Sequence, residues 1–278
     1  MQNVPEQFNG DAGDGWKTLI AGKWEVPPGT ETYHCVRFTL PETITVSSFR
    51  ALSPPGTHHT LLTIVDIPTV PDGGAPCNAA TNGGRSITGS GVGSNDLNFP
   101  QGVAMQVKAG QQVLLNLHLF NVHDKSITGT SGTLFKPIAV TDVKQYAEGV
   151  LAGPINLMIP PGGPTKQSGD CTMTHDSTIF AVSPHMHQLG IYQKVVAHSA
   201  MAGEVVLYDG PYSFDEQLVY PLQKELPMKK GDTVHVECTF QNTTDKSVMF
   251  GESTLSEMCF SGLYRYPAGG DPSFVCLN

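Results

Sequence analysis

The octapeptide "SPHMHQLG" places two histidines, His185 and His187, two positions apart. On a β-strand, alternate residues emerge from the same face, so these two imidazoles would lie close enough to bind one metal ion. An exposed pair of this kind can also be two solvated surface residues. We favour the metal site, because imidazole nitrogens are common ligands of zinc, copper, iron and nickel.

A second pair of histidines, His58 and His59, stands side by side in "PPGTHHTLLTIVD". Successive side chains of a regular strand point to opposite faces of the sheet, so each face would receive one of the two rings. Regular strand geometry therefore predicts that the pair does not serve one site. The local sequence leaves open why two neighbouring histidines are there.

His118 lies in the apolar segment "QQVLLNLHLFNV". The predicted core-facing residues of this segment are Val113, Leu115, Leu117 and Leu119. Strand alternation then turns His118 to the opposite face, together with Asn116. A half-buried imidazole at a sheet edge and a metal ligand explain this position equally well. His123, just beyond the strand, is a weaker candidate for the same role.

The other histidines show no comparable pattern. His235 alternates with the apolar residues of "TVHVECTF", so we expect it to face solvent from a sheet. His34, His175 and His198 have no partner at ligand spacing and are interpreted as ordinary polar residues.

Met258, in "STLSEMCFSGLY", would ordinarily be a thioether that fills space in the core. It stands beside Cys259, however. If Cys259 were bonded to Cys238, the methionine would be held against the neighbouring strand. A fixed thioether is a soft ligand, which favours copper(I) over zinc.

The elements that must position these residues are β-strands. Segments with a two-residue apolar period, such as "YHCVRFTL", "GVAMQVKAG" and "DTVHVECTF", recur along the chain, and turns rich in Gly, Pro, Asp and Asn separate them. This pattern predicts an antiparallel all-β fold, a sandwich or a barrel. The segment nearest to an amphipathic helix, "TDVKQYAEGVLAG", is short. Residues 72–100 are predicted to form one long loop.

Length and charge limit the possible classes of protein. The 278 residues suffice for one large domain or two ordinary ones, and a change of pattern near residues 140–150 favours two sandwiches of similar size. A formal net charge of -9 argues against nucleic acid or an anionic membrane surface as the main partner. The sequence contains no apolar run of the roughly 18 residues that a transmembrane helix needs, and its first residues do not resemble a signal peptide.

The six cysteines are even in number and widely spaced, without a C-x-x-C pair. They are Cys35, Cys77, Cys171, Cys238, Cys259 and Cys276. We expect disulfides in an oxidising compartment, such as a secreted, periplasmic or secretory-vesicle location. Buried free thiols in a cytosolic protein are the alternative.

Four segments, taken in order, resemble a known family. They are "YHCVRFTLP" followed by "THHTLL", then "FPQGVAMQVKAGQQVLLNLHLF", then "PPG…C…FAVSPHMHQLG", and finally "ECTF…GESTLSEMCFSGLYRYP". This arrangement, over roughly residues 32–276, resembles the ascorbate-dependent type II copper monooxygenases, the family of peptidylglycine α-hydroxylating monooxygenase and dopamine β-hydroxylase. The joint order of H-H, H, H-x-H and E-M-C is far more specific than any one motif.

The resemblance implies two antiparallel β-sandwich, jelly-roll-like domains in tandem that face a cleft, over residues 1–145 and 146–278, with one copper in each. A set of three histidines would bind the copper that stores and passes an electron: His58, His59 and His118. A mixed set would bind the copper that activates dioxygen: His185, His187 and Met258. Two neighbouring histidines can bind one metal if the strand bulges locally.

The family pattern also implies three disulfides within the proposed domains: Cys35–Cys77, Cys171–Cys276 and Cys238–Cys259. The implied reaction is hydroxylation of an unactivated or benzylic C–H bond of a small organic substrate, with dioxygen and electrons from ascorbate or a similar one-electron donor. Three protein ligands leave coordination positions open for oxygen or solvent.

Two positions depart from the pattern of the peptide-hydroxylating members. Ser183 stands where those members carry an arginine that grips the substrate carboxylate, and Gly262 stands where they carry a tyrosine. A peptide substrate is therefore in doubt, and we assign no substrate. Met186, between the two ligand histidines, is a further change, whose sulfur would be a bystander or would perturb the copper.

Other functions compete with the monooxygenase. A copper-storage or copper-transfer protein that does not hydroxylate would need the same six ligands. A zinc hydrolase could use the three-histidine set with a water molecule, although Met258 and the order of the motifs count against it. A purely structural sandwich would need none of these side chains.

Overall fold

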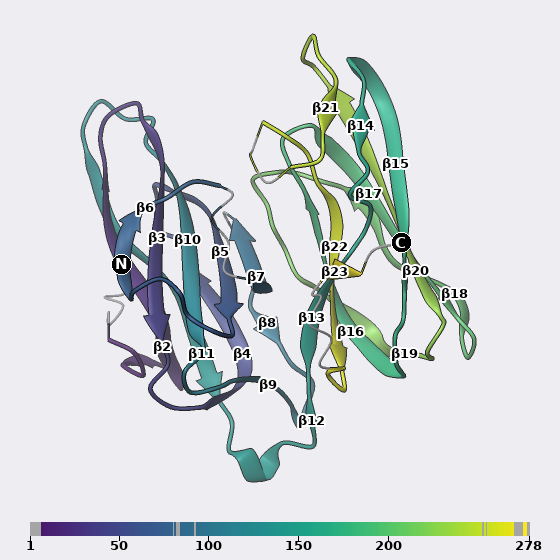
Figure 1. Cartoon of the computed structure of the whole chain (residues 1–278), viewed down its shortest axis with the longest axis horizontal. Coiled ribbons are helices and arrows are strands. Elements are labelled where there is room, and N and C mark those ends of the chain that lie inside the picture. Colours follow the sequence, from purple (N-terminus) through teal and green to yellow (C-terminus); the bar gives the residue numbers. More distant parts are fainter. Residues whose placement is uncertain are drawn as a thin grey trace. The chain divides into compact units, whose positions relative to one another are not determined.

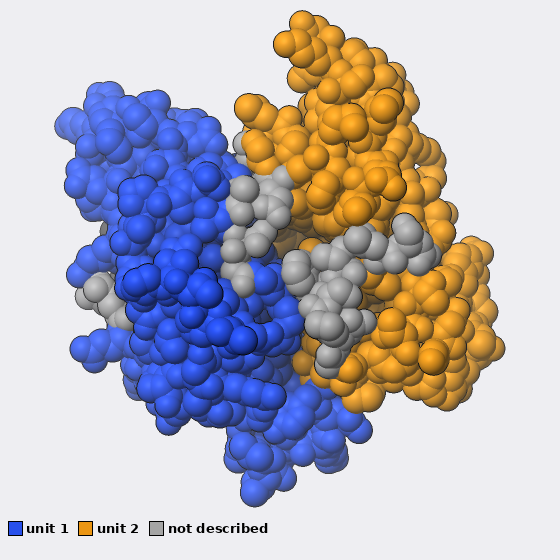
Figure 2. All heavy atoms as spheres, in the orientation of Figure 1, with its two compact units in different colours: residues 1–146 blue, residues 147–278 orange. Residues whose placement is uncertain are grey.

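The computed structural model of the protein describes residues 7–79, 81, 84–91, 93–251, 253, 255–269 and 275–276. The chain forms two compact units, residues 1–146 and 147–278, which Figure 2 shows in blue and orange. Both units consist of β-sheets, so the predicted all-β fold with antiparallel sheets is confirmed. That each unit carries one copper stays a prediction.

Unit 1 contains two sheets. The seven-stranded sheet has the order β1-β2-β11-β4-β9-β12, with β8 also paired to β4. Its strands are β1 Asp11–Gly13, β2 Trp16–Val26, β4 Ile44–Leu52, β8 Leu97–Asn98, β9 Val103–Val107, β11 Ile127–Pro137 and β12 Gln145–Tyr146. The five-stranded sheet has the order β6-β3-β10-β5-β7. Its strands are β3 Glu31–Thr39, β5 Thr57–Val65, β6 Gly73–Pro76, β7 Arg85–Gly91 and β10 Gln112–Phe120.

The two sheets of unit 1 pack closely, face to face. Gly22 of β2 comes so near to β3 that a Cβ atom at this position would lie 2.4 Å from Cγ2 of Val36. In the other sheet, β10 lies between β3 and β5, as Figure 1 shows. Residues 112–119 of β10 are all buried, so both of its faces are covered. This central strand carries His118.

Unit 2 contains a five-stranded sheet, a four-stranded sheet and a two-stranded pair. The first has the order β19-β16-β22-β13-β23, the second has the order β15-β20-β17-β18, and β14 pairs with β21. The strands of the five-stranded sheet are β13 Glu148–Ala152, β16 Ser177–Met186, β19 Tyr220–Met228, β22 Cys259–Tyr266 and β23 Val275–Cys276. The remaining strands are β14 Met158–Ile159, β15 Gly162–Thr172, β17 Gly190–Ser199, β18 Gly203–Pro211, β20 Thr233–Asn242 and β21 Val248–Met249.

The core of unit 2 lies between its two larger sheets. Inward side chains of β20 alternate with partly exposed ones, as the sequence pattern predicts. They pack in one apolar cluster with side chains of β16 and β22 from the other sheet. The cluster therefore fixes β16, which carries His185, relative to the four-stranded sheet.

All six cysteines are joined in disulfides, in the pairs that the family resemblance implies. Cys35–Cys77 ties β3 to the chain just after β6 in unit 1. Cys171–Cys276 joins β15 to β23, and Cys238–Cys259 joins β20 to the first residue of β22, both in unit 2. Bridges over loops of these lengths typically stabilise a fold by about 2 to 4 kcal/mol each. The third bridge lies next to Met258.

One local prediction needs correction. Residues 72–100 are not one long loop, because they contain β6, β7 and β8. Polar residues form strands here because β6 and β7 are the edges of the five-stranded sheet, where backbone pairing needs little apolar content. The segment "TDVKQYAEGVLAG" forms β12 and β13 after a single 3-10 turn, η1 Val140–Asp142. Among the described residues, no helix is long and apolar enough to cross a membrane.

Candidate metal centres

The neighbouring histidines His58 and His59 lie where the register of β5 shifts. His118 of β10 is paired with His59, but Leu119, the next residue of β10, is paired with Thr57. His58 is therefore an extra residue in β5 at this point, as in a β-bulge. The bulge is the departure from regular strand geometry that allows both rings to turn toward β10.

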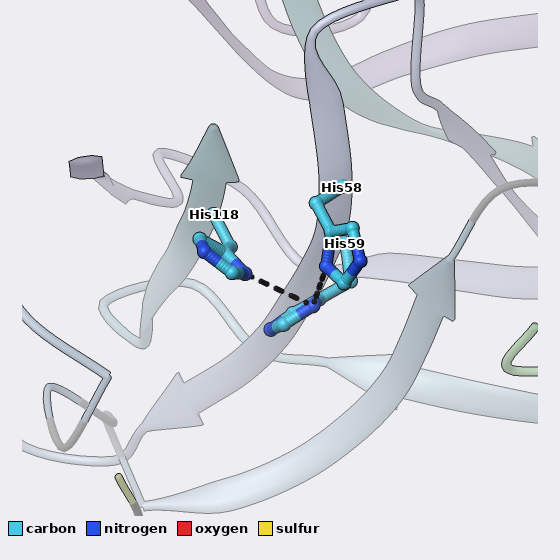
Figure 3. A group of neighbouring side chains, drawn as sticks. All are labelled: His58, His59 and His118. Atoms are coloured by element: carbon cyan, nitrogen blue, oxygen red, sulfur yellow. Dashed lines mark hydrogen bonds between the residues drawn. The ribbon is translucent and has the colours of Figure 1, made fainter. Parts of the chain in front are cut away.

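The three histidine rings converge on one point, as Figure 3 shows. Nδ1 of His59 lies 2.9 Å from Nδ1 of His58 and 3.3 Å from Nδ1 of His118. Nitrogens bound to one metal ion at about 2.0 Å lie roughly 3 Å apart. These two distances, and ligand nitrogens that all lie within 4.8 Å of one another, fit a single metal ion with three imidazole ligands.

The far nitrogen of His118 is held by a carboxylate. Nε2 of His118 lies 2.5 Å from Oε1 of Glu31 on the adjacent strand β3. Donation from Nε2–H to this oxygen leaves Nδ1 with its lone pair directed at the cluster. Tyr33 stacks on the same ring, with centroids 4.4 Å apart and planes inclined by 3°. Glu31 and Tyr33 together fix the orientation of this imidazole.

Burial favours the neutral, ligand form of His118. The residue is 4% exposed. Desolvation lowers the pKa of His118 below the ordinary value of 6.5, the hydrogen bond to Glu31 opposes this shift, and the charge of nearby His58 adds to it. A neutral imidazole is the form that binds a metal.

Sequence reasoning was incomplete for this strand. His118 is not half-buried at a sheet edge, because β10 is the central strand of its sheet. Asn116, on the same face, is buried and holds a loop: its Nδ2 donates to the carbonyl oxygens of Asn78 at 3.0 Å and Thr81 at 2.8 Å. His123 is exposed and lies outside the group of three histidines.

The second candidate site lies on β16 and β22, which are antiparallel neighbours. Their ladder pairs His185 with Phe260 and Met186 with Cys259. One further step along both chains reaches His187 and Met258, so the register brings these two residues opposite each other. The ring centroids of His185 and His187 are 5.4 Å apart, with planes inclined by 89°.

Hydrogen bonds leave one nitrogen of His187 available as a ligand. Nδ1 of His187 lies 2.9 Å from the carbonyl oxygen of Ser256, to which it donates. Nε2 is then the nitrogen with the lone pair. Burial lowers the pKa of His187, although hydrogen bonds to the backbone of Ser256 and Ser253 oppose the shift. Burial also lowers the pKa of His185 to about 3, with a further contribution from the charge of His187. Both rings are therefore neutral, as metal ligands must be.

A buried carboxylate, Glu257, stands between the proposed ligands of unit 2. It is 0% exposed and accepts hydrogen bonds from the backbone N–H groups of His187 at 2.9 Å and Leu189 at 2.7 Å. Burial raises the pKa of Glu257 to about 7, and the backbone hydrogen bonds oppose the shift. The sequence places Glu257 in the E-M-C motif, but the motif gives no role to its side chain.

The surroundings of His185 and His187 include a loop between β18 and β19. Its Phe214 packs edge-on against His187, with ring centroids 6.2 Å apart, and its buried Gln217 hydrogen-bonds His185. Ser183 lies directly opposite Gly262 in the ladder of β16 and β22, and its Oγ donates to the carbonyl oxygen of Leu218 at 3.1 Å. Ser183 and Gly262, the two positions that depart from the peptide-hydroxylating pattern, are thus small residues opposite each other on neighbouring strands.

Met186 is a core residue. It is fully buried in the apolar cluster of unit 2, and its thioether packs against Gly190. Strand alternation turns its side chain to the opposite face from His185 and His187. Its sulfur is therefore a bystander to the proposed site.

The remaining histidines have their own polar contacts. His235 is partly exposed on β20, as predicted, and its Nδ1 lies 2.8 Å from Oδ1 of Asp170. Nε2 of His175 lies 3.0 Å from the carbonyl oxygen of Pro267.

Comparisons with known proteins point to one family. Residues 147–276, nearly all of unit 2, match the family model described as copper type II ascorbate-dependent monooxygenase, C-terminal domain. The human "Putative DBH-like monooxygenase protein 2" is 26% identical over 275 residues, which cover 87% of this chain and 54% of that protein. Human DBH-like monooxygenase protein 1 is 29% identical over 200 residues, which cover 63% of this chain and 32% of that protein.

The chain thus spans about half the length of the first relative and a third of the second. Among solved structures, the major capsid protein P2 of bacteriophage PM2 has a TM-score of 0.34 and 6% identity, with 91% of this chain and 99% of that chain covered. This likeness is too low to bear on fold or function. The family model, which matches residues 147–276, and the DBH-like relatives agree, and both support the copper type II ascorbate-dependent monooxygenase family for this chain.

Proposed function

We propose that the protein is a copper-dependent monooxygenase that hydroxylates a C–H bond of a small organic substrate with dioxygen and a one-electron reductant such as ascorbate. The observation that carries the proposal is the convergence of His58, His59 and His118 in unit 1. This cluster lies outside residues 147–276, which the family model matches, so it supports the assignment independently.

The residues of unit 1 suit a copper ion that changes oxidation state. Imidazole binds both copper(I) and copper(II), and three nitrogens leave further coordination positions open. The stacked Tyr33 and the carboxylate of Glu31 hold His118 in one orientation. A ligand set that hardly moves between oxidation states lowers the reorganisation needed for electron transfer. We therefore assign this set to electron storage and transfer.

The residues of unit 2 suit a copper ion held in its reduced state. His185, His187 and Met258 offer two imidazoles and a soft thioether, which favours copper(I). Bound copper would supply the one-electron chemistry and the activation of dioxygen that the side chains lack. Burial keeps both imidazoles neutral, Phe214 packs edge-on against His187, and Gln217 hydrogen-bonds His185. We assign this set to oxygen activation.

We propose a small substrate. This chain does not bind it through a carboxylate in the way of the peptide-hydroxylating members, because it lacks their arginine at position 183. Ser183 and Gly262 leave the corresponding cross-strand position without an arginine or a tyrosine. The three disulfides support an oxidising location, such as a secreted, periplasmic or vesicular one.

Ascorbate-dependent oxygen uptake by the copper-loaded protein tests this function. A panel of small substrates with benzylic or unactivated C–H bonds would be screened, and the oxygen consumed would be compared with the hydroxylated product formed. We expect coupled product formation in the wild type and its loss in His118→Ala and Met258→Ala. Tight binding of two coppers without coupled product for any substrate would instead favour the storage or transfer protein.

A further inference from the structure

The carboxylate of Glu257 is shielded from solvent. Among the described residues, the donors to its oxygens are backbone N–H groups. Its side chain is 0% exposed. Oε1 accepts from the N–H of Leu189 at 2.7 Å, and Oε2 accepts from the N–H of His187 at 2.9 Å and from that of Met258 at 3.3 Å. A buried carboxylate is costly unless several donors compensate it, so the arrangement needs a reason beyond filling space.

The position of the Glu257 backbone is also fixed. Its N–H donates to the carbonyl oxygen of Met249 at 3.0 Å, and its own carbonyl oxygen accepts from Gly251 at 3.1 Å. These bonds attach the residue to β21 and to the chain just after it. The carboxylate therefore reaches the turn after β16 from a backbone that cannot easily move.

One oxygen atom, Oε2, contacts the backbones of two proposed metal ligands. His187 lies just after β16 and Met258 lies just before β22, 71 positions later in the chain. The ladder between these strands ends with Met186 and Cys259, so its last described pair stops one residue short of both ligands. The shared oxygen continues the connection between the two strands where the ladder has ended.

We propose that Glu257 is a positioning residue that fixes the backbone of His187 relative to that of Met258, so that an imidazole and a thioether are presented to the same copper ion. This inference rests on the proposed function, because it takes His187 and Met258 as ligands. Glu257 itself is not a ligand in this account, since both of its oxygens are engaged by backbone amides.

The test compares Glu257→Gln and Glu257→Ala with the wild type. The side-chain amide introduced by Glu257→Gln can keep one oxygen at the shared position while its nitrogen faces the N–H of Leu189, so this variant retains the link between the two ligands. Alanine removes the link. Glu204→Ala, which removes an exposed carboxylate on β18 of the same unit, is the matched control.

Two properties of each variant are measured, at a temperature at which circular dichroism shows that the variant is folded. The first is copper(I) affinity by competition with a chelator, and the second is sulfur scattering from copper in X-ray absorption spectra. We expect Glu257→Ala to bind the copper of unit 2 about 10-fold to 100-fold more weakly and to lose the copper–sulfur signal. Glu257→Gln should keep the sulfur signal with a smaller loss of affinity. Glu204→Ala should match the wild type.

The outcomes separate this inference from the proposed function. A wild type without a copper–sulfur signal would overturn the proposed function and the inference with it. A wild type with that signal, matched by Glu257→Ala in both sulfur scattering and affinity, would overturn the inference alone, even if the variant melted at a lower temperature. If Glu257→Ala does not fold, Glu257→Leu decides, because it also removes the shared oxygen but fills the buried space: copper affinity and a copper–sulfur signal equal to those of the wild type overturn the inference.

Discussion

Nε2 of His118 lies 2.5 Å from a carboxylate oxygen of Glu31, a residue 87 positions earlier in the chain. The two residues meet because β3 and β10 are neighbours in the five-stranded sheet. Carboxylates in this position set the tautomer and the orientation of a metal-binding histidine. We expect Glu31→Ala to weaken the binding of copper(II) in unit 1 about 10-fold to 100-fold.

Titration of copper(II) against a competing chelator measures this effect, and the copper of unit 2 should keep its affinity. Glu25→Ala is the matched control, because Glu25 is an exposed carboxylate on β2 of the same unit. Equal affinities for Glu31→Ala and Glu25→Ala would show that the Glu31 contact does not tune the site.

Gly153 makes a close backbone contact with the segment of Met258. Its φ angle is +146°, and a Cβ atom there would lie 2.0 Å from the carbonyl oxygen of Cys259. A side chain must therefore push the backbone of Cys259 away, and it must adopt a conformation that favours glycine. We expect Gly153→Ala to lower the free energy of unfolding by about 2 kcal/mol or more and to loosen the copper of unit 2.

Gly262→Ala is the control for this substitution. A Cβ atom at Gly262 would lie 3.4 Å from Cβ of Ser183, which is an ordinary contact. Chemical denaturation of both variants should show a loss for Gly153→Ala and little change for Gly262→Ala. Equal stability of the two variants would mean that Gly153 is not held against Cys259 in solution.

The metal-free protein should lose stability in acid through His185, whose pKa is lowered in the folded protein. Burial lowers the pKa of His185 from 6.5 to about 3 in the folded protein. Between these two values the unfolded chain binds a proton that the folded chain does not, so the free energy of unfolding falls as pH falls from 6.5 toward 3. One such proton contributes a slope of about 1.4 kcal/mol per pH unit.

Urea denaturation of the metal-free wild type and of His185→Gln at several pH values between about 7 and about 4 measures this slope. The variant should show a shallower loss of stability with acidification, because one protonation site has been removed. A pH dependence identical to that of the wild type would show that the pKa of the partly exposed His185 is not lowered in the folded protein.

The strands and the residues that repeat with a clear period could be predicted from sequence alone. Alternation in "DTVHVECTF" corresponds to the observed burial of β20 and places His235 correctly. The same reasoning was misleading for His118, because β10 is covered on both faces and alternation no longer separates core from solvent. It also missed β6 and β7, whose polar composition does not signal a strand.

Sequence patterns do not predict the residues that hydrogen-bond to the proposed metal ligands. Glu31 reaches His118, and Glu257 reaches His187, only through strand neighbours that are distant in sequence. The sequence position of Glu257 is informative, because an acidic residue between a polar turn and a buried strand needs hydrogen-bond donors for its carboxylate. The sequence position of Gln217 is not informative, because its contact with His185 depends on how the loop after β18 folds back.

The central claim is that the chain binds two coppers through two separate ligand sets, one in each unit. The most direct test is metal content by plasma mass spectrometry after copper loading and desalting, on the wild type, His118→Ala and Met258→Ala. We predict two coppers per chain in the wild type and a lower copper content in each variant. Spectra of the same samples identify the copper that is lost: the copper(II) resonance of the unit 1 site in His118→Ala and the copper–sulfur scattering in Met258→Ala. One copper per chain, zinc in place of copper, or the same loss in both variants would contradict the account.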